Sequence, residues 1–514
     1  MLNATPFLKL YSRYRLAKLK TLNYAQQQTS ELLKLIKKAA DTRFGKEHSF
    51  SEIKSVKDFQ DRVPLRRYED FWNDFWKAAF PRLTDCTWPG TIPYFAVTSG
   101  TTAGTTKYIP CSHEMMKSNT KAALDLLVFH IQHKPKSQVF GGKGFVLGGS
   151  TDLVEEAPGI FSGDLSGIVT KTVPWWAKAR YFPDQELALL KNWEEKIDTL
   201  ARLSVKEDIK SLSGVPSWLL ILFDKLCDIY PDKEPKLTSF YPGLELLIHG
   251  GVNFAPYRKQ FLSITGDSDI DMREVYPASE GFIAVADRQY GEGLRAILDH
   301  GIFYEFVPLS ELESPTPTRH WIGNIEMGVN YAVVMTTCAG LWSYIIGDTV
   351  RFVDRYPPRL LISGRTSYYL SAFGEHLLAE EIEDAISTAA NAIKEDVVDY
   401  SVGPLFPKSA KELGGHIYVV EFKNKKIAED SLEEFAKVLD KRLCQRNEDY
   451  QSHRAEGYGL NPPKILVVKA GTFAAWMKSR GKLGGQNKVP RIINDQELLD
   501  NLLNFVRADA REMH

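Results

Sequence analysis

Apolar positions in the first 80 residues recur with the period of an α-helix. In the segment SELLKLIKKAADTRF the apolar side chains that fall on one helical face are Leu32, Leu33, Leu35, Ile36 and Ala39. A stripe of this kind is typical of a helix that packs one face onto a core. The pattern therefore predicts that the chain begins with helices.

From Ile92 onward, short apolar runs alternate with helical stretches. IPYFAV, GKGFVLGGS, LELLIHGG and DMREVYPASEG each read as a strand, and the last three end in turns of small residues. HEMMKSNTKAALDLLVFHIQH and PSWLLILFDKLCDIY have the helical period. Strands that run into glycine or serine turns and are separated by helices predict an α/β domain, with ligands gathered at the strand ends.

The last part of the chain has a more compact pattern. HLLAEEIEDAISTAANAI, SLEEFAKVLDKRLCQRN and TFAAWMKSR predict helices, whereas HIYVVEFK and KILVVKAG predict strands. This alternation indicates a separate small α+β domain. We place the boundary near Thr366, which gives domains of residues 1–366 and 367–514.

The length of 514 residues allows two or three domains. Hydrophobic residues make up 44% of the chain and charged residues 25%, as in ordinary globular proteins. A net charge of −1 argues against nucleic acid or an anionic membrane as the main partner. The five cysteines form no CxxC motif, which indicates a reducing compartment without structural zinc.

The N-terminal stretch MLNATPFLKLYSRYRLAKLK is basic, and charges interrupt its apolar residues. A signal peptide needs an unbroken apolar core, and no run reaches the roughly 18 apolar residues of a membrane span. We therefore expect a cytoplasmic protein with no integral membrane association. The basic helix could touch a membrane surface, but docking on its own domain is the reading we favour.

The loop TSGTTAGTTK, from Thr98 to Lys107, follows a predicted strand. Glycines allow left-handed turns, so backbone N–H groups and hydroxyls can converge on a phosphate, and Lys107 adds a charge. It is not a Walker loop, because Gly100 and Gly104 are too close together and no Gly-Lys pair follows. The alternative is a flexible surface turn.

Four further residues have the chemistry of a nucleotide site. Glu280 in YPASEG could hold a metal that bridges to phosphate, and Asp348 in WSYIIGD could accept the ribose hydroxyls. Arg365 in ISGRTSYY could reach a phosphate, and Lys488 lies in the glycine-rich stretch GKLGGQNKVPR. Each has a plainer alternative as a turn, surface-pair or solvent-exposed residue. Their order and spacing together indicate a function.

This series resembles the adenylate-forming enzymes, which include acyl-CoA synthetases, luciferases and the adenylation domains of peptide synthetases. More closely, the chain resembles the acyl-acid amido synthetases of the auxin-responsive Gretchen Hagen family, in a shorter, bacterial-type form. The motifs that carry the resemblance span nearly the whole chain: VPLRRYEDFW, TSGTTAGTTKYIP, YPASEG, FYEFVP, YAVVMTTCAGLWSYIIGD, VVKAGTF and GGQNKVPRI.

The resemblance implies a large N-terminal adenylate-forming domain with sheet and barrel-like subdomains, and a small mobile α+β lid. It implies ATP and Mg²⁺ as cofactors, with the metal at Glu280. Lys107, Arg365 and Lys488 would be catalytic. The nucleotide would be bound by Ser99, Gly100, Thr101, Thr102, Tyr276, Ser279, Glu280, Tyr344 and Asp348.

The implied reaction activates a carboxylic acid as an acyl-adenylate, releases pyrophosphate, and passes the acyl group to an amine, most simply an amino acid. The plant enzymes favour Tyr-Arg-Tyr-Arg before the Gly-Asp pair, whereas this chain has WSYI. Its ISGRTSYY segment is closer to the hinge of acyl-CoA ligases, so an acyl-CoA synthetase is the alternative. A non-catalytic nucleotide sensor is a further one. The acid, the acceptor and the oligomeric state are left open.

Overall fold

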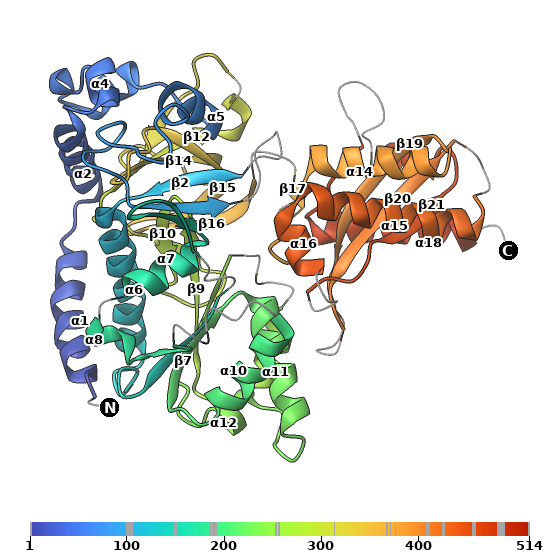
Figure 1. Ribbon diagram of the computed structural model, residues 1–514, viewed down its shortest axis with the longest axis horizontal. Coiled ribbons are helices and arrows are strands. Elements are labelled where there is room, and N and C mark those ends of the chain that lie inside the picture. The colour runs from blue at the N-terminus through green and yellow to red at the C-terminus, as the bar shows by residue number, and fades with distance from the viewer. Residues whose placement is uncertain are drawn as a thin grey trace. The chain divides into compact units, whose positions relative to one another are not determined.

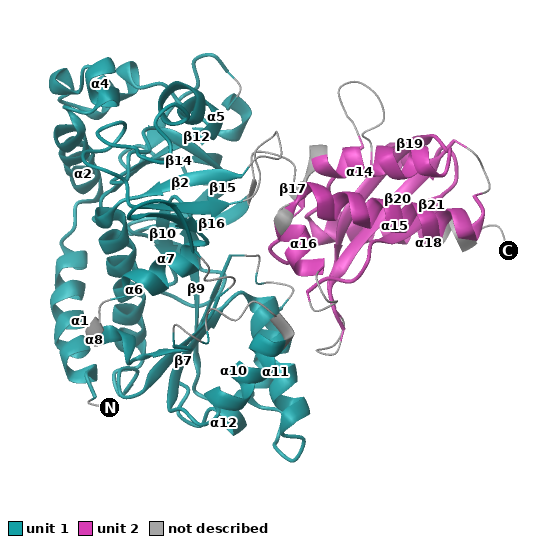
Figure 2. Cartoon of the chain, in the orientation of Figure 1, with its two compact units in different colours: residues 1–98, 106–366 teal, residues 99–105, 367–514 magenta. Residues whose placement is uncertain are grey.

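The computed structural model forms two compact units, drawn by element in Figure 1 and by unit in Figure 2. One unit comprises residues 1–98 and 106–366, and the other comprises residues 99–105 and 367–514. The structure describes residues 3–98, 106–148, 153–173, 175–184, 187, 193–251, 254, 257–312, 314–365, 369–370, 372–375, 377–407, 412–423, 427–454, 459–480 and 489–511. Each unit has its own hydrophobic core.

A twelve-stranded sheet runs through the first unit, and one end of it is parallel. The parallel strands, in spatial order, are β6 (Tyr181–Phe182), β3 (Lys143–Leu147), β7 (Ile209–Gly214), β8 (Leu246–Gly250) and β9 (Asp271–Ala278). Helices connect β3, β7, β8 and β9 along the chain. The carboxyl ends of the parallel strands therefore meet at one edge, the usual place for a ligand in such sheets.

The rest of this sheet is antiparallel and continues from β9. In spatial order its strands are β10 (Gly281–Val285), β11 (Leu294–Ala296), β16 (Pro358–Arg365), β15 (Tyr344–Arg355), β14 (Asn330–Thr337), β12 (Ile302–Pro308) and β13 (His320–Trp321). Register shifts interrupt the β9–β10, β14–β15 and β15–β16 ladders. Irregularities of this kind bend strands and increase their twist, so this half of the sheet is curved.

A second, four-stranded sheet carries the loop singled out in the sequence. Its order is β2 (Lys107–Cys111), β1 (Tyr94–Thr98), β5 (Ile160–Gly163) and β4 (Leu153–Ala157). β1 pairs with β2 in the antiparallel sense and with β5 in the parallel sense. The loop between β1 and β2 therefore joins the ends of two neighbouring strands.

Helices cover the sheets of the first unit (Figure 1). They are α1 (Thr5–Lys20), α2 (Tyr24–Ala39), α3 (Arg43–Glu47), α4 (Val56–Arg62), α5 (Tyr68–Phe71), α6 (His113–His133), α7 (Leu165–Thr172), α8 (Trp175–Lys178), α10 (Trp193–Ser204), α11 (Pro216–Ile229), α12 (Leu237–Phe240) and α13 (Arg258–Thr265). Short 3-10 helices lie at η1 (Phe50–Glu52) and η3 (Leu309–Glu311), and a short π-helix lies at η2 (Trp72–Trp76). Asn23 and Ser112 start α2 and α6 by accepting backbone N–H bonds from the first turn.

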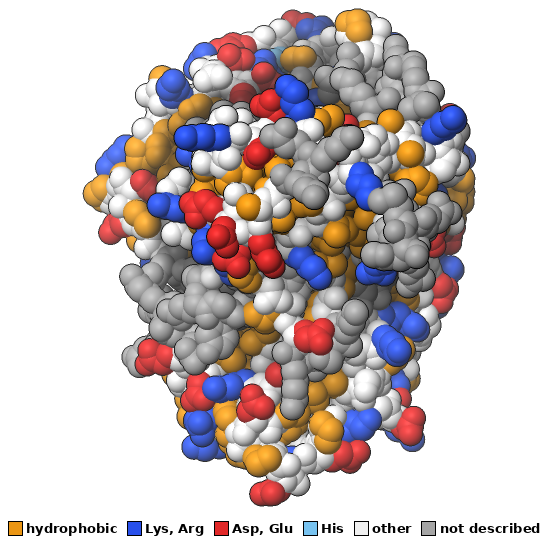
Figure 3. Space-filling view, turned by 90° about the vertical axis from the view of Figure 1, so that its right-hand side faces the viewer, with side chains coloured by type: hydrophobic (Ala, Val, Ile, Leu, Met, Phe, Trp, Pro, Cys, Tyr) orange, Lys and Arg blue, Asp and Glu red, His pale blue; other side chains and the backbone are white. Residues whose placement is uncertain are grey.

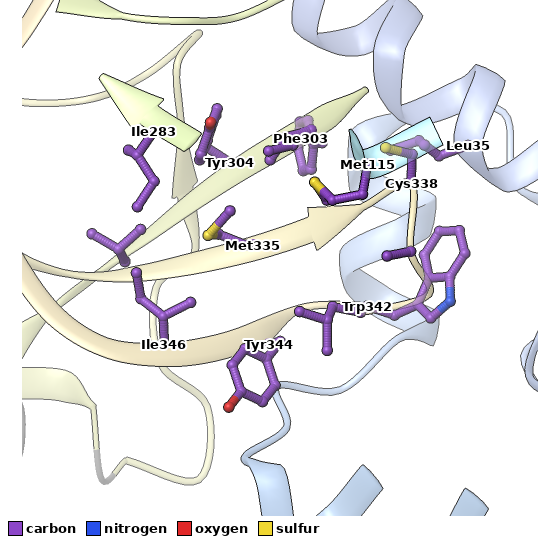
Figure 4. Close-up of a cluster of buried hydrophobic side chains, with 14 of the residues drawn as sticks. Leu35, Met115, Ile283, Phe303, Tyr304, Met335, Cys338, Trp342, Tyr344 and Ile346 are labelled. Atoms are coloured by element: carbon purple, nitrogen blue, oxygen red, sulfur yellow. The ribbon is translucent and has the colours of Figure 1, made fainter. Parts of the chain in front are cut away.

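The core of the first unit joins elements that are distant in the sequence. Leu35 of α2, Met115 of α6, Ile283 of β10 and Met335 of β14 belong to one buried cluster (Figure 4). Trp342 lies in the same cluster, fully buried, and its indole N–H donates to the carbonyl oxygen of Thr87 at 2.9 Å. The N-terminal helices are thus packed onto the strands that carry the candidate site.

A buried ion cluster attaches α1 to this unit. Arg15, 2% exposed, donates both to Asp125 of α6 and to Asp299, at 2.5–2.7 Å. Burial alone would raise the pKa of Asp299, but the hydrogen bonds and charge of Arg15 lower it to about 2. Leu8 and Leu19 pack on either side of this cluster, in two small apolar groups.

The second unit is a small α+β fold. Its sheet has the order β19 (Val397–Leu405), β20 (Gly415–Phe422) and β21 (Lys464–Val468), and β17 (Tyr369–Leu370) pairs with β18 (Leu377–Leu378). Its helices are α14 (Ala379–Ala392), α15 (Glu429–Arg446), α16 (Glu448–Arg454), α17 (Thr472–Ser479) and α18 (Gln496–Arg511). Ile417 and Val419 of β20 pack with Trp476 of α17 and Leu502 of α18.

Charged side chains of both signs are interspersed on the face shown in Figure 3, with apolar side chains between them. This mixture agrees with the net charge of −1. Within the described ranges, no helix combines the length and the apolar character that a bilayer-spanning segment needs.

The structure confirms a mixed α/β fold with a large N-terminal part and a smaller C-terminal part. Each strand and helix expected from the periodicity is present. The elements that the sequence interpretation missed include β19 and α18 in the second unit and α10 and β7 in the first. α18 has a regular apolar stripe, so periodicity could have found it.

We expect replacement of Arg15 by leucine to destabilise the first unit by about 3–5 kcal/mol, because Asp125 and Asp299 would lose their buried counter-charge. Thermal unfolding should shift to lower temperature, and amide hydrogen exchange in α1 should accelerate. Arg13→Leu, on the exposed side of the same helix, is the control and should change neither. Equal effects of the two replacements would contradict a structural role for the ion cluster.

Candidate active site

The glycine- and threonine-rich loop is set by the β1–β2 hairpin. Thr98 ends β1 and lies directly opposite Lys107, the first residue of β2. Ser99, Gly100, Thr101 and Thr102 lie outside the described residues. Lys107 is partly buried, and its ammonium group is 5.6 Å from the centre of the Tyr68 ring. Lys107 is therefore fixed at the base of the loop.

Tyr68 holds α5 next to this hairpin. Its hydroxyl accepts the backbone N–H of Tyr108 at 2.9 Å. Burial raises the pKa of Tyr68 to about 12, so the phenol is neutral at physiological pH. Tyr68 belongs to the VPLRRYEDFW stretch, which thus contacts the start of β2.

Ser279 and Glu280 form the two-residue turn between β9 and β10, because Ala278 pairs with Gly281. Both side chains are partly exposed. Gly281 has a φ of +154°, and a Cβ atom there would lie 2.6 Å from Cδ1 of Ile302. The glycine of YPASEG therefore lets the turn sit close against β12.

Glu280 is near β2 as well. Burial is the main cause that raises the pKa of the Cys111 thiol to about 12, and the negative charge of Glu280 raises it further. Cys111 is fully buried and makes an unreactive thiol. Because the charge of Glu280 affects Cys111, the β9–β10 turn and the β1–β2 hairpin lie in one region of the unit.

Tyr276 and Asp348 are joined by a hydrogen bond across the sheet. The hydroxyl of Tyr276, on β9, donates to Oδ2 of Asp348, on β15, at 2.6 Å. Tyr276 is 5% exposed, and Asp348 is partly exposed. The bond occupies one carboxylate oxygen and fixes the direction of the other.

The Gly-Asp pair depends on a left-handed turn at Gly347, whose φ is +92°. Asp348 pairs in register with Arg365, at the end of β16. The side chain of Arg365 and the whole of Lys488 lie outside what the structure describes. Their proposed roles stay predictions.

Tyr344 is 1% exposed and starts β15, opposite Met335. Its ring centre is 6.1 Å from that of Phe71, within the aromatic core. In Figure 4 Tyr344 and Ile346 lie along the same strand. The Tyr344 side chain thus packs in the aromatic core at the start of the strand that leads to Asp348, and its contact with a nucleotide stays a prediction.

A buried ion pair that the sequence reading missed fixes the start of β15. Arg319 binds Glu305 of β12 through two nitrogens, at 2.9 and 3.0 Å. Ser343 bonds to both side chains: its hydroxyl donates to Glu305 at 2.9 Å and accepts from Arg319 at 2.6 Å. The glutamate inside the apolar motif FYEFVP was the available signal.

His249 and Glu274 were also missed. They pair in register on β8 and β9, close to the carboxyl ends of these strands. Burial lowers the pKa of His249 to about 3 and raises that of Glu274 to about 7. The His249 ring stacks on Phe254 at 3.6 Å, and its Nδ1 atom has no hydrogen-bond partner among the described residues. The position of His249 and Glu274 within otherwise apolar strands was the sequence signal that could have identified them.

A magnesium ion fits Glu280 only in combination with phosphate oxygens. The described residues contain no group of three His, Cys, Asp or Glu side chains placed to bind a metal. Mg²⁺ in nucleotide enzymes is held by one or two carboxylates plus substrate phosphates. A single partly exposed carboxylate at a turn is consistent with that mode.

Comparisons with known proteins agree along the whole chain. Three family models match, described as the GH3 family N-terminal domain (residues 14–270), central domain (residues 295–365) and C-terminal domain (residues 380–497). Jasmonoyl–L-amino acid synthetase JAR4 of Nicotiana attenuata is 22% identical, over 95% of this chain and 94% of its own length. Indole-3-acetic acid-amido synthetase GH3.4 of Arabidopsis thaliana is 22% identical, over 92% and 90%.

Solved structures share the fold. AtGH3.15 acyl acid amido synthetase matches with a TM-score of 0.61 at 19% identity, covering 97% of this chain and 96% of its own. 2-Hydroxyisobutyryl-CoA ligase, in its thioesterification state, matches with a TM-score of 0.59 at 16% identity, covering 96% and 94%. An amide-forming and a thioester-forming enzyme thus have the same architecture as this chain.

The raised pKa of Glu274 predicts a stability that falls with pH. Because the pKa of Glu274 is about 7 in the folded state and 4.5 is its ordinary value, stability is full below pH 4.5 and declines through pH 7. The loss is about 3 kcal/mol. We expect Glu274→Gln to remove this loss, so that the variant gains several degrees in Tm over the parent at pH 8.5 but not at pH 4.5. A Tm difference that does not change with pH would contradict the prediction.

Proposed function

We propose that this chain, which belongs to the GH3 family, is an ATP-dependent acyl acid amido synthetase. It would activate a carboxylic acid as an acyl-adenylate and then transfer the acyl group to the amine of an amino acid. The observation that carries the proposal is the Tyr276–Asp348 hydrogen bond, which unites the second and third nucleotide motifs in one place. The amide-forming relatives support the reaction type.

In the first half-reaction, a carboxylate oxygen of the acyl acid attacks the α-phosphorus of ATP, and the bond to the bridging oxygen of the β-phosphate breaks. Pyrophosphate leaves with that electron pair. In the second, the amine nitrogen attacks the acyl carbon, AMP leaves with the carbon–oxygen bonding pair, and the nitrogen loses a proton. Both steps depend mainly on positioning and on neutralising charge.

The residues take the following roles in this proposal. Ser99, Gly100, Thr101 and Thr102 bind the phosphates that become pyrophosphate, and Lys107 at the loop base adds a positive charge. Asp348, which Tyr276 orients through its hydrogen bond, accepts the ribose hydroxyls. Glu280 holds Mg²⁺, which supplies positive charge to the phosphates when bound. Ser279 and Tyr344 line the nucleotide site.

The second unit would act as a lid, with residues 1–366 as the adenylation domain and residues 367–514 as the mobile part. An acyl-adenylate hydrolyses readily, so closure that excludes water favours transfer over loss. Arg365 lies at the junction, and Lys488 would reach the α-phosphate from the lid. The expected cytoplasmic location stays a prediction.

The relatives support an amine acceptor, since one is named for an amino acid and the other for amide formation. The Gly-Arg segment at the unit boundary is the observation that favours CoA as the alternative acceptor. A direct assay over a panel of acids would identify the substrate acid of this chain.

The proposal is tested by pyrophosphate release with ATP and Mg²⁺ over a panel of aryl, indole and fatty acids, with hydroxylamine to trap the activated acyl group. We expect pyrophosphate, AMP and a hydroxamate from one class of acid. Amino acids and CoA then replace hydroxylamine, and formation of an amide rather than a thioester identifies the acceptor. Tight ATP binding without turnover would support the sensor instead, and release of ADP would refute the loop assignment.

Asp348→Asn removes the charge that would receive the ribose hydroxyls. We expect KM for ATP to rise about tenfold to a hundredfold, the equivalent of one charge-assisted hydrogen bond, with a smaller change in kcat. Asp354→Asn, on the same strand but paired with Arg359, is the control and should leave KM for ATP unchanged. Equal shifts in the two variants would remove Asp348 from the site.

Lys488→Ala should slow adenylation more than it slows amide formation from supplied acyl-adenylate, because only adenylation develops charge on the attacked α-phosphate. Single-turnover assays of each half-reaction measure the two rates. Lys482→Ala, in the same glycine-rich stretch, is the control. Equal slowing of both half-reactions by Lys488→Ala would refute the assignment.

A further inference from the structure

One face of helix α1 packs on the core, and another carries exposed apolar side chains. Leu8, Arg15 and Leu19 are buried against the unit. On another side of the helix, Phe7 is 70% exposed, Leu10 68% and Tyr14 66%. Their spacing of three and four residues aligns them in one stripe along the helix. Scattered apolar side chains are normal on a surface, but an aligned run of three large ones marks an interaction site.

The stripe is held outward by rigid packing. Arg15 is bound on both sides by Asp125 and Asp299, and Leu8 and Leu19 are fixed in separate apolar groups. The helix therefore cannot roll to bury Phe7, Leu10 and Tyr14 without breaking the buried ion cluster. In Figure 1, α1 runs along the outer side of the unit, next to α6.

The charge around the stripe is entirely positive within the helix. α1 has the sequence TPFLKLYSRYRLAKLK, with no acidic residue. Arg13, Lys18 and Lys20 are exposed and Lys9 is partly exposed. Lys18 has a weak link to Asp299, 3.7 Å away, but that carboxylate is already paired with Arg15. The net charge of −1 for the whole chain conceals this basic surface.

The apolar stripe and the basic side chains of α1 together indicate which kind of partner could bind this surface. A second copy of α1 would bring like charges together, and three side chains on one convex helix offer much less than the roughly 800 Å² per partner of a standard interface. An interfacial bilayer matches both features, because its headgroups are anionic and its acyl boundary receives aromatic and aliphatic side chains.

We propose that α1 docks the chain peripherally on an anionic membrane surface. Phe7, Leu10 and Tyr14 enter the headgroup–acyl boundary, while Arg13, Lys18 and Lys20 contact lipid phosphates. The helix lies flat and does not span the bilayer. This binding is independent of the candidate active site, since no residue of α1 belongs to it.

Co-sedimentation of the full chain with vesicles tests the proposal. Vesicles of phosphatidylcholine with 30% phosphatidylserine should bind the protein, with a partition coefficient about tenfold above that of pure phosphatidylcholine vesicles, and salt should weaken the binding. The double variants Phe7→Ser/Leu10→Ser and Arg13→Glu/Lys20→Glu should each lose about tenfold of this binding, because they remove the apolar and the electrostatic contribution separately.

The matched control is Val154→Ser/Tyr356→Ser, which removes exposed apolar side chains (60% and 79% exposed) away from α1. It should bind the anionic vesicles as the parent does. Thermal unfolding verifies that all variants fold. Absence of binding by the parent, or equal binding by the α1 variants and the control, would overturn the proposal. A parent that is dimeric by light scattering, with monomeric α1 variants, would overturn it in favour of a self-interface.

Discussion

The curvature of the twelve-stranded sheet is the constraint on which the candidate site depends. Between β9 and β15 lie β10, β11 and β16, so a flat sheet would hold these two strands about 19 Å apart. Yet the hydroxyl of Tyr276 reaches the carboxylate of Asp348 at 2.6 Å. β11 has three residues and pairs with β16 at Arg359 and Leu360, away from the end that carries Arg365. The sheet can therefore curl at the level of Asp348, and the interrupted ladders on both sides supply the bend.

Buried polar groups then fix the strand that carries Asp348, which the curvature of the sheet brings close to Tyr276. Ser343 has a φ of +47°, a left-handed conformation that costs a non-glycine residue about 1–3 kcal/mol. Its N–H donates to Thr336 and its hydroxyl bonds to both Glu305 and Arg319, which offsets that cost. Because β15 starts here, the buried ion pair sets the position of Asp348 further along the strand. An apolar replacement could fill the same space but could not hold the turn in this conformation.

The sequence allowed prediction of the features that depend on local pattern, namely secondary structure and turns. Periodicity located many of the helices and strands, and the small residues of YPASEG and IIGD identified turns that do carry the glutamate and the aspartate. It could not reveal that Tyr276 bonds Asp348, 72 residues away, because that contact follows from the order and curl of the strands. Nor could it pair Glu305 with Arg319 or align His249 with Glu274, since both depend on register between separate segments.

Electrostatics divides the proposed reaction between the two parts of the chain. Adenylation joins a carboxylate to a polyphosphate, and Glu280 and Asp348 add negative charge on the same unit. The Tyr276 hydroxyl donates to one oxygen of Asp348, and in the proposed function this carboxylate would receive the neutral ribose hydroxyls. In the proposed reaction, positive charge would therefore come from Lys107, from metal at Glu280, and from residues late in the chain. A unit that binds the nucleoside firmly but needs outside cations for chemistry would react only once the late residues arrive. In the proposed mechanism, that requirement would tie activation of the acid to closure of the second unit, and so protect the acyl-adenylate from water.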